Sequence, residues 1–140
     1  MSILFTDTNV KQDVLFKARS LTNLNPKNGE RLIFTATLYN YGNGYDTKTG
    51  IFTAPDAGTY FFTGQLCPKV SKNIHCGIVV DGNDVTRTYA YGLGYHTCYS
   101  TDAIVKLEQY SQVWIQSYYD LDELFSDGSR WNTFTGVILH

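Results

Sequence analysis

The chain has 140 residues and a mass of 15.8 kDa, which is the size of one domain. Hydrophobic residues make up 43% and charged residues only 17%, which excludes an intrinsically disordered chain and argues against a long-helix protein. A net charge of −2 indicates no basic surface for nucleic acid, and no apolar run approaches the roughly 20 residues of a transmembrane helix. We therefore expect neither a nucleic-acid partner nor membrane insertion.

The N-terminal residues carry little structural signal. Met1–Asp7 is too short and too polar for a secretory signal peptide, which leaves open an intracellular chain or one whose signal has been removed. We expect residues 1–12 to form a loosely attached arm and residues 13–140 to form the globular domain.

Strand-forming residues dominate the rest of the chain. Eleven Tyr, eight Phe and two Trp, with many Thr, Val and Ile, suit a pleated and half-buried surface. Strands are predicted, in chain order, at 14–19, 30–39, 51–53, 59–66, 74–80, 85–91, 97–108, 112–118 and 133–139. Polar segments rich in turn formers separate them, and Asp81-Gly82-Asn83-Asp84 is a strong hairpin signal. Some nine or ten short strands predict an all-β sandwich or jelly roll.

Aromatic and turn residues recur at fixed spacing from the second to the fourth predicted strand. They are Phe34, Asn40, Tyr45, Phe52, Gly58, Tyr60 and Phe62. In this spacing the sequence resembles the globular head of complement C1q, a jelly roll of about ten strands shared with tumour necrosis factor. The C-terminal run from Phe134 through Gly136 to Leu139 resembles the closing strand of the same family, so the resemblance covers about residues 14–140. Gly64 departs from the pattern, which has an aromatic residue there. We interpret all the pattern residues as scaffold, because a fold does not fix an activity.

The resemblance implies a homotrimer that acts by recognition and is secreted. The collagen stalk usual in the family is missing from this sequence, which implies a bare head or a fragment of a longer chain. Bare heads resemble the soluble C1q-domain lectins of invertebrate innate immunity, which are pattern-recognition proteins that bind microbial carbohydrate. The alternative implied by the family is a secreted signalling or adhesion ligand that binds a protein receptor.

Three cysteines, Cys67, Cys76 and Cys98, leave an odd thiol. In the jelly roll the strand ending at Leu66 runs antiparallel to the one starting near Thr97, which would bring Cys67 and Cys98 within disulfide reach. The alternative is three free thiols in a cytosolic chain, because spacing alone does not assign pairing.

Catalytic and metal motifs are weak. No Gly-x-Ser-x-Gly elbow or triad spacing occurs, so we expect no enzyme. Zinc binding by Cys67 and the pairs His75-Cys76 and His96-x-Cys98 matches no established spacing. We expect no cofactor. Calcium stays open, because acidic side chains occur in the hairpin and in the long polar loop, although the usual family seat is absent from residues 88–100.

The segment 118–131 is the predicted ligand site. It offers aromatic faces for stacking on a sugar ring and charged groups for hydroxyls or a carboxylate. The predicted residues are Tyr118, Tyr119, Asp120, Asp122, Glu123, Arg130 and Trp131. The alternative is a cover whose aromatic residues pack on the sheet. A second aromatic run, Tyr89, Tyr91, Tyr95 and Tyr99, favours packing between subunits over ligand stacking.

Overall fold

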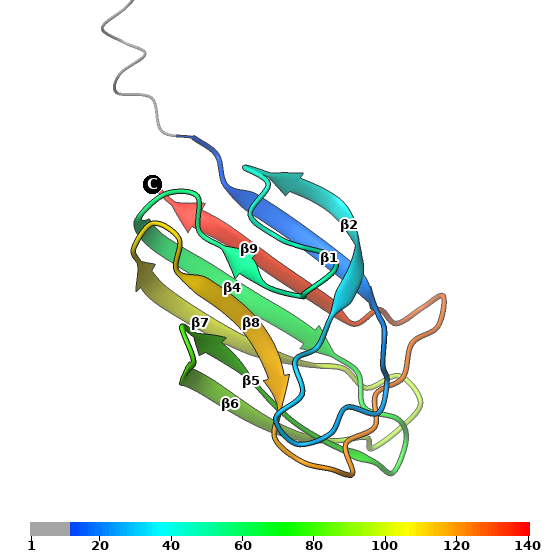
Figure 1. The fold of residues 1–140 in the computed structure, drawn as a ribbon. Helices are drawn as coiled ribbons and strands as arrows, with labels where there is room; N and C mark the ends of the chain where they lie inside the picture. Colours follow the sequence, from blue (N-terminus) through cyan, green and yellow to red (C-terminus); the bar gives the residue numbers. More distant parts are fainter. Residues whose placement is uncertain (1–11) are drawn as a thin grey trace, which may run out of the picture.

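A computed structural model describes residues 12–140, so the predicted N-terminal arm lies, apart from Gln12, outside the described residues. The described chain consists of β-strands and their connections (Figure 1). The strands are β1 (Leu15–Leu21), β2 (Phe34–Tyr41), β3 (Phe52–Thr53), β4 (Gly58–Leu66), β5 (Asn73–Val80), β6 (Asn83–Tyr91), β7 (Tyr99–Leu107), β8 (Gln112–Ser117) and β9 (Thr133–Leu139). The predicted strands are therefore present, with ends that differ by a few residues. No helix in this part of the chain is long and apolar enough to cross a membrane.

The strands form two antiparallel sheets. One sheet has the order β2-β1-β9-β4-β7, and the other has the order β3-β8-β5-β6. Neighbours in each sheet are mostly distant in sequence, as β4 shows by pairing with β7 on one side and β9 on the other. The predicted all-β jelly roll is confirmed.

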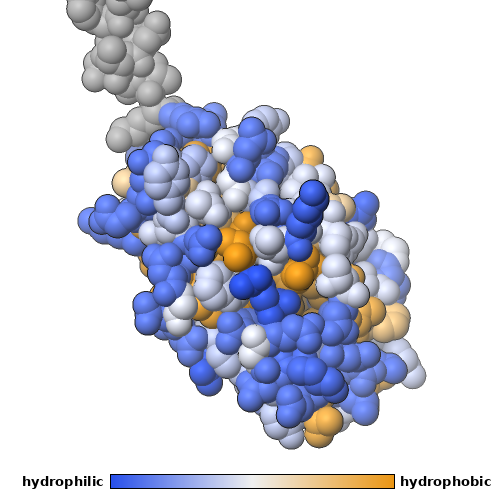
Figure 2. All heavy atoms as spheres, in the orientation of Figure 1, coloured by the Kyte–Doolittle hydropathy of each residue, from blue (hydrophilic) through white to orange (hydrophobic). Residues whose placement is uncertain are grey.

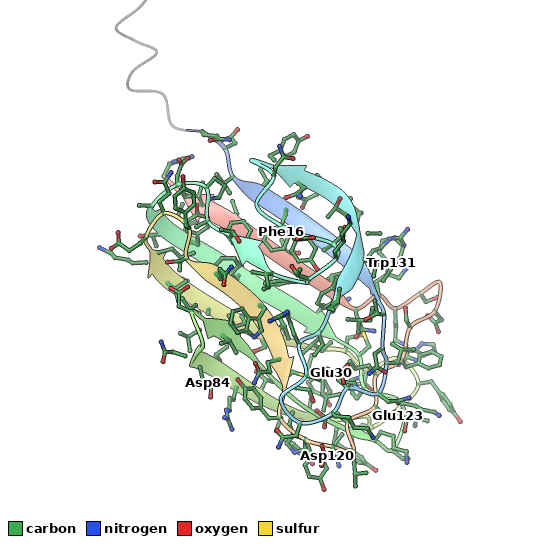
Figure 3. The ribbon with its side chains drawn as sticks, viewed as in Figure 1. Phe16, Glu30, Asp84, Asp120, Glu123 and Trp131 are labelled. Carbon is green, nitrogen blue, oxygen red and sulfur yellow. A yellow bond between two sulfur atoms is a disulfide. The ribbon has the colours of Figure 1, made fainter. Side chains whose placement is uncertain are left out.

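Aromatic rings fill the space between the sheets. Strand alternation turns every second side chain inward, and the six largest inward side chains are fully buried. They are Phe16, Phe34, Phe52, Tyr60, Phe62 and Phe134. The Phe16 ring stacks 5.0 Å from Phe52 and meets Phe134 edge-on at the same distance; Figure 3 labels Phe16 between the sheets. Each buried ring stabilises the fold by roughly 1.5–3 kcal/mol from burial alone.

Two glycines, one in β4 and one in β9, make room for these side chains. A Cβ at Gly136 would lie 2.6 Å from a Phe16 ring atom. At Gly64, where the family pattern has an aromatic residue, a Cβ would lie 2.6 Å from Cδ1 of Ile115. Ile115 from the opposite sheet thus occupies the space that the missing ring would need.

Tyr45 connects the β2–β3 segment to the core. Its hydroxyl donates to the Phe34 carbonyl at 2.8 Å and accepts from the Phe34 amide at 3.0 Å. The Asn40 side-chain amide forms two further hydrogen bonds with the backbone of Tyr45: it donates to the Tyr45 carbonyl and accepts from the Tyr45 N–H. Burial raises the pKa of Tyr45 above its ordinary range. Phe34, Asn40 and Tyr45 therefore hold the scaffold together.

Four connections gather at one end of the molecule: β1–β2, β4–β5, β6–β7 and β8–β9 (Figure 1). Leu66 pairs with Tyr99, and immediately beyond that pair Cys67 and Cys98 form a disulfide between the β4–β5 and β6–β7 connections. The Leu124 amide donates to the Leu24 carbonyl at 2.7 Å, which joins the β1–β2 and β8–β9 connections. This end, called the loop end below, holds the candidate site.

Candidate functional site

The ligand residues predicted in segment 118–131 do not form one cluster. Figure 3 labels Asp120 and Glu123 at the loop end, Trp131 farther along the same side and Asp84 away from both. The structure distributes the predicted side chains among a loop-end cleft, a neighbouring cleft on the four-stranded sheet and a third place beside β1.

Asp122 is buried beneath the loop end. Its carboxylate, with a side-chain exposure of 0%, accepts the His75 backbone N–H at 2.7 Å and the Ser117 hydroxyl at 3.0 Å. The second oxygen lies 2.9 Å from His75 Nδ1. Because a carboxylate only accepts, Nδ1 must carry the hydrogen of this bond. Asp122 thus fixes the His75 ring and ties the loop to β5 and β8.

The loop-end cleft has a volume of about 500 Å³. Its lining residues come from the β1–β2, β4–β5 and β8–β9 connections and from the start of β5: Asn25, Lys27, Ser71, Lys72, Asn73, Tyr119, Asp120, Leu121, Asp122 and Glu123. Figure 2 shows that hydrophilic residues dominate this end of the molecule in the view drawn. The connections that carry Asn28 and Asp120, 92 residues apart in the chain, are therefore brought together around one polar hollow.

Most of the charges around this cleft are paired with protein groups. Asp120 accepts the Asn28 amide at 3.0 Å, and Glu123 lies 2.9 Å from Lys69 Nζ and 3.9 Å from Lys72 Nζ. Tyr119 is 43% exposed, and its ring centroid lies 4.7 Å from that of His75. The cleft consequently presents one aromatic face among hydrogen-bonding groups.

A second cleft lies on the outer face of the four-stranded sheet. It has a volume of about 300 Å³ and is lined by His75, Arg87, Thr88, Tyr89 and Tyr118. The Tyr118 hydroxyl donates to Asp84, and the Arg87 guanidinium donates twice to the same carboxylate while lying 3.8 Å above the Tyr118 ring. Burial and the bond to Asp84 raise the pKa of Tyr118 to about 12, while the Tyr118 and Arg87 donors lower the pKa of Asp84.

Arg130 and Trp131 lie in a third region of the surface, outside both clefts. Arg130 is only 7% exposed, with its guanidinium 4.6 Å above the Phe125 ring. Its Nε and Nη1 atoms have no hydrogen-bond partner among the described residues. The Trp131 ring lies 3.9 Å under the Arg19 guanidinium, and its carbonyl accepts from Gln65. Neither side chain lines the two clefts described above.

The remaining cysteine is chemically inert. Cys76 is fully buried, and burial together with the nearby Asp122 charge raises its pKa above the ordinary range, so the thiol stays protonated. Cys67 and Cys98 are joined to each other and cannot serve as thiolate ligands of zinc. Within residues 12–140 no three His, Cys, Asp or Glu side chains are grouped as metal ligands.

The tyrosine-rich run follows β6 and the β6–β7 connection. Tyr89, Tyr91 and Tyr95 are exposed, and the Tyr99 hydroxyl donates to the Tyr91 carbonyl at 2.8 Å. Tyr89 faces the second cleft, with its ring 4.8 Å from that of His75.

A row of apolar side chains crosses the outer face of the five-stranded sheet. Successive pairings place Tyr41 beside Leu15, Leu15 beside Val137, Val137 beside Phe61, and Phe61 beside Ile104. Ile104 is 66% exposed. The row spans all five strands, so this face carries a continuous apolar band.

Sequence reasoning missed the contributions of Lys27, Lys72 and Asn73 to the loop-end cleft. Each lies in or beside a polar connection, and no local pattern distinguishes these side chains from other solvated turn residues. Their proximity to Tyr119 follows from the sheet topology, which brings the connections to one end.

The comparisons with known proteins agree with this architecture. Residues 15–139 match the sequence model of the C1q domain. The chain is 30% identical over 128 residues to human complement C1q tumor necrosis factor-related protein 3, and 29% identical over 124 residues to the human related protein 2. These alignments cover 90% and 86% of this chain but 51% and 43% of the relatives, so the chain spans about half the length of the curated relatives it matches.

Solved structures show the same fold. The globular domain of zebrafish complement 1qA protein superposes with a TM-score of 0.71 at 15% identity, covering 93% of this chain and 98% of that one. Murine APRIL superposes with a TM-score of 0.67 at 15% identity, covering 92% and 100%. The match to the C1q sequence model extends over nearly the whole chain, and the chain belongs to the C1q domain family, as the spacing from Phe34 to Phe62 predicts.

Proposed function

We propose that this protein is an extracellular, non-enzymatic recognition protein that assembles as a homotrimer and binds microbial carbohydrate at the loop-end cleft. The observation that carries the proposal is the cleft of about 500 Å³ in which Tyr119 is surrounded by amide, hydroxyl, ammonium and carboxylate groups. Ligand sites combine a concave shape with a few placed polar groups, and most of the residues that line this cleft are polar.

The chemistry of the cleft suits a sugar ring. Asn25 and Asn73 each offer a donor and an acceptor, Lys27 offers donors, and Asp120 keeps lone pairs beyond the one used by Asn28. The exposed face of Tyr119 suits the C–H side of a pyranose. Of the residues expected from sequence, we retain Tyr119, Asp120 and Glu123 for direct contact and assign Asp122 to positioning them.

Homotrimer assembly is supported by the apolar row on the five-stranded sheet and by the family resemblance. Contiguous apolar surface on a soluble domain marks an interaction site, and a second copy of the same chain is the partner always present. The family resemblance indicates that the assembly contains three copies of the chain. Three identical clefts on one rigid assembly would convert weak single-site binding into useful avidity.

The Cys67–Cys98 disulfide supports an extracellular location, because such bonds persist in oxidising compartments. We propose that binding needs no cofactor. The carboxylates of Asp120 and Glu123 already have protein partners, so neither needs a calcium ion to balance its charge. Loss of glycan binding in the presence of EDTA would instead reveal a calcium requirement.

The second candidate function is binding of a protein receptor. Leu93, Tyr95 and Leu121 expose large apolar side chains on the β6–β7 and β8–β9 connections, and such side chains at a loop end favour a protein partner. The curated relatives are named as complement C1q tumor necrosis factor-related proteins.

A microbial glycan array tests the proposal. We would probe it with the intact protein, with and without EDTA, after light scattering has established the mass in solution. Retention of defined glycans by a species of three times 15.8 kDa, with competition by the free sugar, is the expected result. A trimer that retains no glycan but binds one protein on a receptor display would move the assignment to the second candidate.

A further inference from the structure

The two clefts are lined by neighbouring residues of β5 and of the segment after β8, and we infer that together they form a single extended site for a neutral oligosaccharide rather than a pocket for one sugar ring. This inference rests on the carbohydrate function proposed above and adds the length and charge of the ligand. It brings into the site the second cleft, in which Tyr118 belongs to the segment expected from sequence while His75, Arg87 and Tyr89 come from β5 and β6.

Contacts across β5 establish that the clefts adjoin. Asn73 lines the loop-end cleft and His75 lines the second, and residues two apart on a strand face the same side, about 7 Å apart. The Tyr89 hydroxyl in the second cleft donates to Asn73 Oδ1 at 3.0 Å. The His75 ring lies between the two tyrosines, 4.7 Å from Tyr119 and 4.8 Å from Tyr89. The rings of Tyr119, His75 and Tyr89 thus mark the boundary between the two clefts.

The second cleft is already ordered for binding. The Arg87 guanidinium is held by two hydrogen bonds to Asp84 and by the Tyr118 ring beneath it. The His75 ring is fixed by the buried Asp122 carboxylate. Because side chains that are immobilised in the free protein lose little entropy on binding, these groups favour a ligand that reaches them.

The balance of charge selects a neutral ligand. The loop-end cleft is lined by two lysines and three carboxylates, and the second cleft adds Arg87, which is paired with Asp84. No surplus of positive charge remains to attract a polyanion. The dense array of donors and acceptors around Tyr119 and Tyr89 is what hydroxyl groups require.

Calorimetric titration of the intact protein tests the inference. The probes are glucose, N-acetylglucosamine and the linear dimers, tetramers and hexamers of each, with sulfated dextran as the polyanion. We expect at least one neutral series to bind at least tenfold more tightly as the tetramer than as the monosaccharide.

Variants locate the gain in affinity. Tyr89→Ala should remove the dependence on length, so that the tetramer binds no more than about twofold more tightly than the monosaccharide. Val85→Ala, an exposed side chain on β6 that lines neither cleft, is the matched control and should behave as the native protein. Circular dichroism melts of both variants check that each remains folded.

Several results would overturn the two-cleft site: equal affinity for monomer and tetramer, a length dependence that survives Tyr89→Ala, preferential binding of sulfated dextran, or no binding of either neutral series. If the glycan array is positive while these titrations fail, only the two-cleft inference is lost. If the array retains no glycan, the carbohydrate function is lost with it.

Discussion

Replacing Asp122 by alanine should destabilise the protein far more than any other change among the loop carboxylates. The substitution deprives the His75 amide, the His75 ring and the Ser117 hydroxyl of their shared acceptor. Each buried donor left without its acceptor costs about 1–3 kcal/mol, because it loses its partner without regaining water. The His75 side chain is 32% exposed and can recover one water contact, so we expect the lower end for the three donors together, about 3 kcal/mol.

A loss of this size is readily measured. For a domain of this length each 1 kcal/mol lowers Tm by roughly 3–4 °C, so Asp122→Ala should melt about 10 °C below the native protein. Thermal melts must be compared at one protein concentration, because association changes apparent stability. Asp120→Ala is the matched control: this exposed carboxylate accepts only the Asn28 amide, and its loss should cost less than about 1 kcal/mol. Equal Tm values for the two variants would refute the structural role assigned to Asp122.

Three further predictions concern the assembly and the cysteines. Ile104→Asp should leave the monomer folded, because the side chain is exposed, but should dissociate the proposed trimer by placing a charge in the apolar row; sedimentation that still shows a trimer would contradict this. Replacing both Cys67 and Cys98 by serine should lower the free energy of unfolding by about 3–4 kcal/mol, because the bond closes a loop with a sequence separation of 31; denaturant titration of the two proteins measures the difference, and unchanged stability would refute it. Cys76 should resist maleimide at pH 8 in the folded protein and react as one thiol per chain in denaturant, because burial raises its pKa; rapid labelling of native protein would show that the thiol is accessible.

The scaffold was predictable because its signals are local or periodic. Phe52, Tyr60 and Phe62 lie at spacings that strand alternation turns inward, and all three are buried as their pattern predicts. The Cys67–Cys98 bond was expected only from the jelly-roll resemblance, which sets the strand ending at Leu66 beside the one starting near Thr97, and the structure confirms the bond. The sequence could not predict that Ile115 fills the space left by the missing aromatic residue at Gly64, because Ile115 lies in the opposite sheet.

The candidate site was predictable only as a region. Within segment 118–131 no periodicity relates a residue to a face, so sequence reasoning treats Asp120 and Asp122 alike. The structure separates them: Asp122 lies under the loop against His75, while Asp120 lines the cleft at its surface. Arg130 and Trp131 follow the loop away from the cleft toward β1, where Arg19 covers the Trp131 ring. Contacts between distant segments decide these positions.

The central claim is that the loop-end cleft binds carbohydrate, and mapping the bound glycan on the protein tests it most directly. We would titrate the intact protein with the glycan best retained on the array and follow the amide chemical shifts. We expect the largest changes at residues 71–73 and 119–123, and their loss in Tyr119→Ala but not in Tyr110→Asn, a change at the opposite end of β8. Shifts confined to the β7–β8 end or to the five-stranded face, or a protein that retains no glycan at all, would contradict the claim.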